Sequence, residues 1–267
     1  MRITRMRSVA AGLAIAALVF ACNSDDEDTL GPNVASGVFR ASGNGQTALL
    51  GDTLGDSVAA FVANSRANGV SGATVTWTVT GGGGSVSPTT SVTDAQGIAR
   101  TRWTLGKGAT GENTLTASVE GVSEPVTFTA TANPLSFSAN LTGAQERPNP
   151  VTTPATAAAL FSWNGTQLTY QVTVSGTTTS NIVGAHIHGP QPDSTKNAAV
   201  ILDFKPAAGQ TTGIIAQGTA TAQSGQTPIA TVPIDSVITL MRARAAYVNV
   251  HTVNNPGGEM RGQVKSP

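Results

Sequence analysis

Cysteine is almost absent from this chain: Cys22 is its one example, so no disulfide can form within the molecule. Charged residues make up 11% of the 267 positions and aromatic residues 4%, which leaves too little charge for a charged disordered protein. Glycine, threonine, serine, alanine and valine abound instead. That balance is typical of exported β domains with many turns and argues against a helical enzyme.

Motifs of the common enzyme classes are missing as well. The chain contains no Gly-x-Ser-x-Gly elbow, no cysteine nucleophile, no His-Glu-x-x-His, no phosphate-binding loop and no dinucleotide fingerprint. The 15 basic and 15 acidic residues balance, and loss of residues 1–21 would remove three arginines. The mature chain is therefore mildly acidic, and nucleic acid is not an expected partner. We expect binding rather than catalysis.

Residues 1–21 have the form of a secretory signal peptide. Arginines precede an apolar run that is too short for a comfortable transmembrane helix and has the length of a signal core. The run ends in Val-Phe-Ala-Cys at 19–22, which resembles a bacterial lipobox and would make Cys22 the lipidated first residue of the mature protein. Its acyl chains would anchor the protein to a membrane. A plain signal peptide with an incidental cysteine is the alternative.

Residues 22–40 are predicted to form an acidic, flexible tether. In the simplest interpretation, the run Asn-Ser-Asp-Asp-Glu-Asp at 23–28 is solvated charge. The sharper interpretation is a sorting signal, because Asn23 and Ser24 are not aspartate and an acidic patch after a lipidated cysteine resembles a surface-export signal. We expect a lipid-anchored protein of the bacterial cell envelope, at the outer membrane or the cell surface.

Residues 41–133 predict a first domain of about seven short strands separated by Gly-rich turns, the pattern of a β-sandwich. The clearest strand, 73–80, alternates threonine with apolar residues and places Trp77 in the core. The glycines at 81–84 predict a loop. Three segments resemble a bacterial Ig-like domain of the invasin and intimin type: 69–77, 93–99 and 111–117. The resemblance implies a stalk or an adhesive module.

Residues 135–267 predict a second domain, an antiparallel β-sandwich or barrel, so the whole chain is expected to be all-β. Asn-Gly at 164–165 between two apolar runs is a strong hairpin signal. One helix is expected at 235–244, with Asp235 or Ser236 as its N-cap. Strands are expected at 135–141, 158–163, 168–174, 184–189, 198–204, 214–221, 247–253 and 260–264.

All three histidines of the chain lie in two of these predicted strands. Because strand side chains alternate, His186 and His188 share one face, and His251 shares a face with Asn249. If the apolar neighbours face the core, all three imidazoles point away from it. Two histidines two apart on a strand can chelate a metal, and a third from another strand could complete a set for copper or zinc. The plain alternative is that all three are surface or hydrogen-bonded polar positions.

Nearby acidic and polar residues could support such a site. Asp193 or Glu259 could be a further ligand or could orient one from behind. Glu259 and Arg261 share a strand face, where a cross-strand ion pair or a turn anchor is expected rather than a catalytic pair. Asp203 and Glu146 are the other acids available in this half of the chain.

The same stretches carry a family resemblance. Ala-His-Ile-His-Gly-Pro at 185–190, Ala-Tyr-Val-Asn-Val-His-Thr at 246–252 and Asn-Pro-Gly-Gly-Glu-Met-Arg-Gly-Gln at 255–263 resemble the CHRD domain. Leu-Thr-Gly-Ala-Gln-Glu-Arg-Pro at 141–148 resembles the start of that family. The resemblance covers about 135–267 and implies an all-β domain of poorly defined function. A fainter likeness to the copper–zinc superoxide dismutase barrel lacks the fourth copper histidine, the zinc histidines and the disulfide pair of that family.

Two functions of different classes follow from these observations. The first is an envelope lipoprotein, anchored through Cys22, whose Ig-like stalk presents a CHRD domain for non-catalytic binding of an envelope polymer or protein partner. The second is a copper- or zinc-binding envelope protein, with redox chemistry as an option, that uses His186, His188 and His251. The second requires all three imidazoles to lie near one point. A purely structural surface module is a third interpretation.

Overall fold

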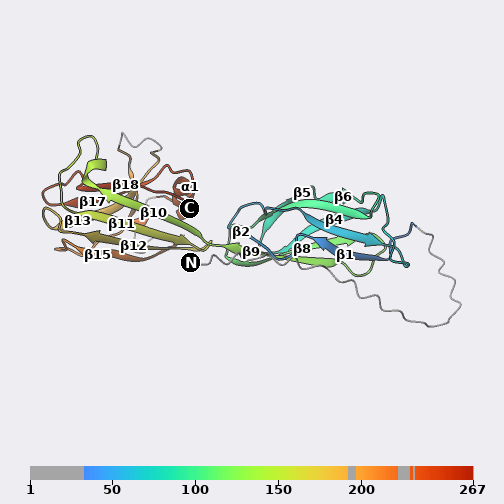
Figure 1. Cartoon of the computed structure of the whole chain (residues 1–267). Coiled ribbons are helices and arrows are strands. Elements are labelled where there is room, and N and C mark those ends of the chain that lie inside the picture. The colour runs from blue at the N-terminus through green and yellow to red at the C-terminus, as the bar shows by residue number, and fades with distance from the viewer. Residues whose placement is uncertain (1–32, 192–196, 222–228, 231, 267) are drawn as a thin grey trace, which may run out of the picture.

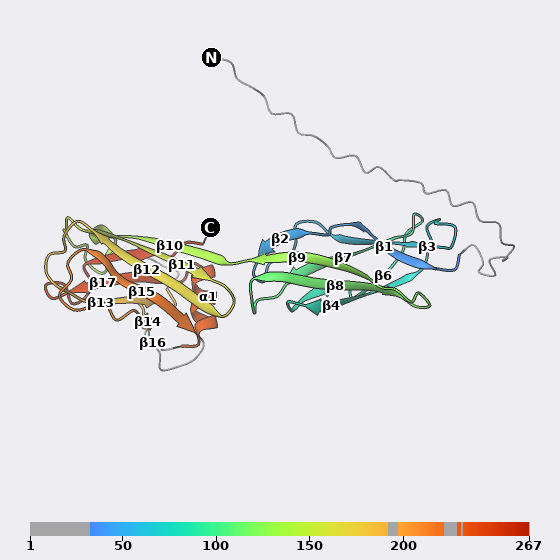
Figure 2. The ribbon, with the colours of Figure 1, turned by 90° about the horizontal axis from the view of Figure 1, so that it is seen from below.

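A computed structural model of the chain describes residues 33–191, 197–221, 229–230 and 232–266. The predicted signal peptide with Cys22, and Asp193 in the second domain, lie outside these described residues. Strands dominate the rest, and two elongated units follow one another along the chain (Figures 1 and 2). The all-β prediction is confirmed.

The N-terminal unit is an Ig-like β-sandwich of two sheets. One sheet has the strand order β1–β3–β7–β5 and the other β2–β9–β8–β4–β6. Buried side chains of both sheets, Trp77 and Trp103 among them, form the core between them. The strands are β1 (Gly37–Ser42), β2 (Gln46–Leu49), β3 (Val58–Ala63), β4 (Thr74–Gly81), β5 (Gly84–Ser87), β6 (Thr90–Val92), β7 (Ile98–Leu105), β8 (Gly111–Val119) and β9 (Val126–Asn133).

Three details of this unit differ from the sequence predictions. Strand β1 begins at Gly37 and pairs with β3, so residues 37–40, which were predicted to belong to the tether, are part of the sandwich. The glycine turn is confined to Gly82 and Gly83, both with positive φ, because the flanking glycines belong to the ladders of β4 and β5. Nine strands form instead of about seven, since the short strands β2, β5 and β6 have too few residues to show alternation.

The C-terminal unit is one antiparallel sheet with the order β15–β12–β11–β10–β18–β17–β13–β14–β16. The predicted hairpin turn joins β11 to β12, and Gly165 has the positive φ (98°) that its turn needs. The strands are β10 (Leu135–Thr142), β11 (Thr156–Trp163), β12 (Gln167–Ser175), β13 (Ile182–His188), β14 (Val200–Asp203), β15 (Gly213–Thr221), β16 (Ile229–Ala230), β17 (Tyr247–Thr252) and β18 (Met260–Gln263).

This sheet folds over so that its two ends share one core. Phe204, which follows β14, lies 4.9 Å from Tyr170 of β12 and 6.1 Å from Phe161 of β11 between ring centroids. Because β14 and β12 stand near opposite ends of the strand order, this contact requires the sheet to close on itself as a sandwich. The interior is filled by alternate residues, among them Leu168, Tyr170, Val172 and Val174 of β12.

Helix α1 (Ile234–Arg242) buries an apolar face against this core, formed by Ile234, Val237, Ile238 and Met241. The prediction of Asp235 or Ser236 as its N-cap is wrong. Pro233 precedes the first turn and supplies no side-chain cap, while Asp235 lies inside that turn, where a negative charge favours the helix dipole. In the described part of the chain, neither α1 nor the short 3-10 helix η1 (Gly143–Gln145) has the length and hydropathy to cross a membrane.

The two units meet at defined contacts. Pro134 alone separates β9 from β10, and α1 lies at the junction (Figures 1 and 2). Arg242 of α1 donates to the Leu50 carbonyl oxygen at 2.8 Å and pairs with the Asp52 carboxylate. The hairpin turn is so close that a Cβ on Gly165 would lie 2.6 Å from backbone atoms of the N-terminal unit.

Candidate metal centre

Strands β13 and β17 bring all three histidines to one face. Their register places His186 opposite Asn249, His188 opposite Tyr247 and Gly184 opposite His251. The other face carries Ile187, Val248 and Val250, which are fully buried in the core. The alternation predicted from the sequence therefore holds on both strands.

The three imidazoles converge. One nitrogen from each ring lies within 4.8 Å of the others. The ring centroids of His186 and His251 are 4.8 Å apart, those of His186 and His188 5.6 Å, and those of His188 and His251 6.0 Å. Since metal–nitrogen bonds measure about 2.0–2.1 Å, each nitrogen would have to move by less than about 1 Å to share one ion.

Gly184 makes this convergence feasible. A Cβ built on Gly184 would lie 2.9 Å from Cε1 of His186 and 3.7 Å from Cβ of His251. The His186 ring thus leans over the glycine toward the strand that carries His251. Any side chain at this position would occupy the space that the ring uses.

In each ring, one nitrogen faces an oxygen that accepts hydrogen bonds. Nδ1 of His188 lies 2.9 Å from the Ala198 carbonyl oxygen, and Nδ1 of His251 lies 2.9 Å from the Pro256 carbonyl oxygen. Nε2 of His186 lies 3.6 Å from the Asp203 carboxylate. Because a carbonyl oxygen can only accept, Nδ1 of His188 and of His251 carries the proton, and Nε2 of the neutral ring keeps its lone pair.

The opposite nitrogens have no partner among the described residues. Nδ1 of His186, Nε2 of His188 and Nε2 of His251 are buried atoms without a hydrogen bond. A buried polar atom without a partner needs an explanation, and an ion between three such atoms provides one. An outer oxygen that fixes the ring while the inner nitrogen stays free is the arrangement of metal-binding histidines.

Burial keeps the rings neutral. Burial lowers the pKa of His188 to about 4, despite its hydrogen bond to the Ala198 carbonyl oxygen. Burial and the neighbouring His251 lower the pKa of His186, although Asp203 acts in the opposite direction. Burial also lowers the pKa of His251. At neutral pH all three rings are therefore in the form that binds metals.

A stacked column supports His188 from the side. The Tyr247 ring lies parallel to the His188 ring, with 4.8 Å between centroids and 4° between planes. The Arg261 guanidinium covers the other side of Tyr247, 3.6 Å from the ring centroid. The backbone of Ala198 makes two hydrogen bonds here: its N–H donates to the Tyr247 hydroxyl oxygen, and its carbonyl oxygen accepts from Nδ1 of His188. The His188 ring is therefore fixed at its edge by the hydrogen bond to Ala198 and on one face by stacking on Tyr247.

A buried carboxylate lies against Asn249, on the face of β17 that also carries His251. Glu146 is 2% exposed, and both of its oxygens accept hydrogen bonds from Asn249 Nδ2, at 2.8 and 3.0 Å. Burial raises the pKa of Glu146 to about 7, although Asn249 and Arg261 favour its charged form. The sequence had shown Glu146 as an available acid without a role, because no local pattern relates it to β17.

Glu259 is a turn anchor. This fully buried carboxylate accepts hydrogen bonds from the hydroxyls of Thr153, Thr179 and Thr252 and from the Asn255 amide. Burial alone would raise the pKa of Glu259, but these hydrogen bonds outweigh it and lower the pKa. Arg261 instead donates to Asn197 at 2.9 Å. Of the roles predicted for Glu259, which included a metal ligand and an ion pair with Arg261, the contacts fit the turn anchor.

The sequence therefore located the three histidines but not their surroundings. It predicted three histidines on one shared face, and the plain alternative made them surface or hydrogen-bonded polar positions. His188 is only 8% exposed, but Nδ1 of His188 and of His251 each lie 2.9 Å from a backbone carbonyl oxygen, so the hydrogen-bonded alternative fits these two rings. Loops cover this face, and they contribute Ala198, Pro256 and Glu146. No residue pattern signals a backbone carbonyl as partner, so these contacts could not be predicted.

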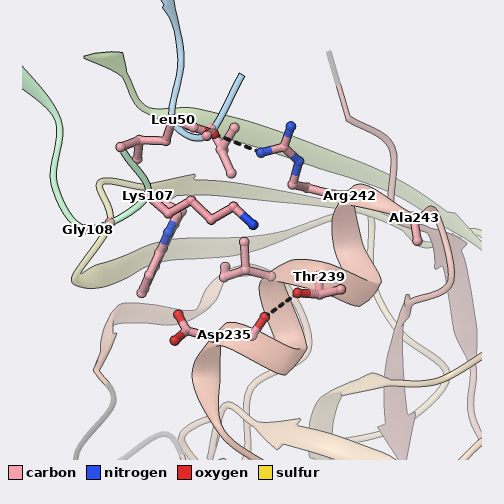
Figure 3. A pocket seen from close by; sticks show the side chains of 12 residues that line it. Leu50, Lys107, Gly108, Asp235, Thr239, Arg242 and Ala243 are labelled. Atoms are coloured by element: carbon pink, nitrogen blue, oxygen red, sulfur yellow. Dashed lines mark hydrogen bonds between the residues drawn. The ribbon is translucent and has the colours of Figure 1, made fainter. Parts of the chain in front are cut away.

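A hollow of about 760 Å³ lies where the two units meet (Figure 3). Lys107 and Asp235 reach into it from opposite units. The third charged residue, Arg242, is already engaged with Leu50 and Asp52. Its walls carry no cluster of converging, unpaired polar atoms, so the histidine cluster is the better candidate site.

The fold and this cluster together define an all-β protein of two units with a buried polar centre in the second. Residues 137–264 match the family model of the CHRD domain, so the C-terminal unit is a CHRD domain. This match confirms the resemblance seen in the histidine segments. A search of curated proteins finds no match.

Several solved structures show a looser similarity. The D0–D1 domain of intimin is 10% identical, covers 82% of this chain and 92% of its own, and has a TM-score of 0.30. Domains 5–6 of the S-layer protein SbsC are 13% identical, with coverages of 86% and 97% and a TM-score of 0.28. InvD of Yersinia pseudotuberculosis is 14% identical, with coverages of 89% and 98% and a TM-score of 0.28. These scores are too low to bear on function.

Proposed function

We propose that the CHRD domain binds one transition-metal ion, copper or zinc, through His186, His188 and His251. The observation that carries this proposal is the set of three buried imidazole nitrogens that lack partners and belong to one cluster. Imidazole suits both metals. The role is binding rather than catalysis, because buried donor atoms offer little room for a substrate beside the ion.

The N-terminal unit then serves as a stalk. Its Ig-like sandwich would hold the CHRD domain away from a membrane to which a lipidated Cys22 attaches the chain. The sequence supports this arrangement through the lipobox-like segment at 19–22 and the acidic run that follows it. Replacement of Cys22 by serine should release the protein from the membrane fraction.

Metal titration tests the proposal. The Cys22→Ser protein should bind one Cu or Zn ion per chain, and His186→Ala/His188→Ala should weaken binding at least about 100-fold, since loss of two ligands leaves one. The matched control is Gln217→Ala/Thr219→Ala, which changes two exposed residues of the same spacing on β15. Equal binding by the histidine variant, or no binding by the parent, would overturn the proposal and favour an envelope polymer or protein as the ligand.

A further inference from the structure

We infer that the centre selects a monovalent soft ion, Cu(I), over Zn(II) and other divalent ions. The inference rests on the proposed metal site and adds the identity and oxidation state of its ion. It follows from the charge of the donor set, the charges around it and the burial of the donor atoms.

The donor set carries no charge. The cluster consists of three histidines, and no carboxylate or thiolate of the described residues belongs to it. Zn(II) sites of proteins reach four ligands, often with thiolates, carboxylates or a water molecule that share the double charge. Three imidazoles leave a divalent ion with its full charge, whereas Cu(I) is stable with three neutral donors.

The surrounding charges do not compensate for a divalent ion. Asp203 is the acid next to the cluster, opposite His186 in the register of β13 and β14. Its carboxylate is engaged with the Lys205 ammonium at 2.5 Å. On the other side, Arg261 lies on the Tyr247–His188 column and adds positive charge. A divalent ion would therefore meet roughly neutral surroundings.

Burial converts this charge balance into selectivity. Each of the three unpartnered nitrogens exposes less than 1 Å² to solvent. The cost of moving an ion from water into such a site grows with the square of its charge, so a divalent ion costs about four times as much as a monovalent one. Buried donors also leave little access for the water that would complete a Zn(II) site. Each effect favours Cu(I).

The test is a pair of competition titrations on the Cys22→Ser protein, which removes the thiol that would itself bind Cu(I). Cu(I) is titrated without oxygen against bicinchoninate, and Zn(II) against a chromophoric zinc chelator. We expect one Cu(I) per chain, bound at least about tenfold more tightly than Zn(II), and X-ray absorption of the loaded protein should show the cuprous edge. Zn(II) binding of equal or greater affinity, or a cupric edge under reducing conditions, contradicts the inference.

A charge variant tests the reason for the selectivity. Lys205 is half exposed and has a positive φ of 50°, so asparagine, which tolerates that conformation, is the suitable replacement. Lys205→Asn would free the Asp203 carboxylate and should shift the Zn(II)-to-Cu(I) affinity ratio toward zinc by roughly threefold. An unchanged ratio would refute the electrostatic reason. If no metal binds at all, the proposed function fails together with the inference; if zinc binds as well as copper, only the inference fails.

Discussion

Strand β4 of the N-terminal unit and strand β17 of the CHRD domain differ in how the side of the strand that faces away from the core is used. In the N-terminal unit, β4 alternates core residues with exposed threonines, among them Thr76, Thr78 and Thr80. In the CHRD domain, every residue of β17 except His251 is buried, on both faces. A polar side chain on an open face meets water at no cost, but on a covered face it needs a protein partner. Polar side chains that need protein partners, the three histidines among them, therefore lie on the sheet face that loops cover.

The comparison predicts its largest effect at Glu259. Glu259→Ala should destabilise the CHRD domain by about 3 kcal/mol, because it leaves several buried donors without their acceptor. The control is Glu112→Ala, at an exposed position of β8 in the other unit, with an expected change within about 0.5 kcal/mol. Chemical denaturation followed by tryptophan fluorescence measures both. Similar losses of unfolding free energy in the two variants would contradict the expected difference between the covered and the open sheet face.

Glu146 should make stability depend on pH. Its pKa is raised from 4.5 to about 7 in the folded state, so folding favours its protonated form. The contribution is fully present below pH 4.5 and is lost as the pH rises through 7. Glu146→Gln keeps an uncharged group against Asn249, so its stability relative to the parent should rise by on the order of 2 kcal/mol between pH 4.5 and 8. A difference that stays constant with pH, in thermal or urea unfolding, would contradict this account.

Gly184 should matter to metal binding more than to folding. In Gly184→Ala, the added methyl would displace the His186 ring, so metal affinity should fall about tenfold while stability changes by about 1 kcal/mol or less. Gly257→Ala, in the same domain, has open space around its new Cβ and should leave affinity unchanged. Titration calorimetry distinguishes them. Full affinity in Gly184→Ala would show that the ring does not need its observed position.

The smallest contrast uses one substitution in both units. Thr252→Val removes a buried hydroxyl that donates to Glu259 at 2.7 Å and should cost about 1–2 kcal/mol. Thr78→Val changes an exposed threonine in a strand of the N-terminal unit and should stay within about 0.5 kcal/mol. Urea unfolding at one pH measures the pair. Equal losses of unfolding free energy in the two variants would contradict the claim that polar groups on the covered face depend on protein partners.

The sequence predicted the parts of this molecule that depend on local periodicity. Alternation revealed most strands, placed Trp77 in a core and put His186 and His188 on one face. The Asn-Gly dipeptide located its hairpin, since that turn needs a residue with positive φ. The CHRD resemblance was also readable from short segments around the histidines.

What the sequence could not predict depends on register and on covering loops. That His186 stands opposite Asn249, and Gly184 opposite His251, follows from strand pairing between segments some 60 residues apart, which alternation leaves open. The outer nitrogens of His188 and His251 face backbone carbonyl oxygens of loops, which no residue pattern signals. The N-cap of α1 was predicted wrongly because Pro233 supplies no capping side chain to detect, although the predicted start lies one residue from Ile234.

The central claim is that three imidazoles share one metal ion. Extended X-ray absorption fine structure of the copper-loaded Cys22→Ser protein measures this directly. The account predicts a first coordination shell of three nitrogen atoms at about 2.0 Å, with the outer-ring scattering of three imidazoles. A shell dominated by oxygen or sulfur, or one with a single imidazole, would contradict it and return the three histidines to a purely architectural role.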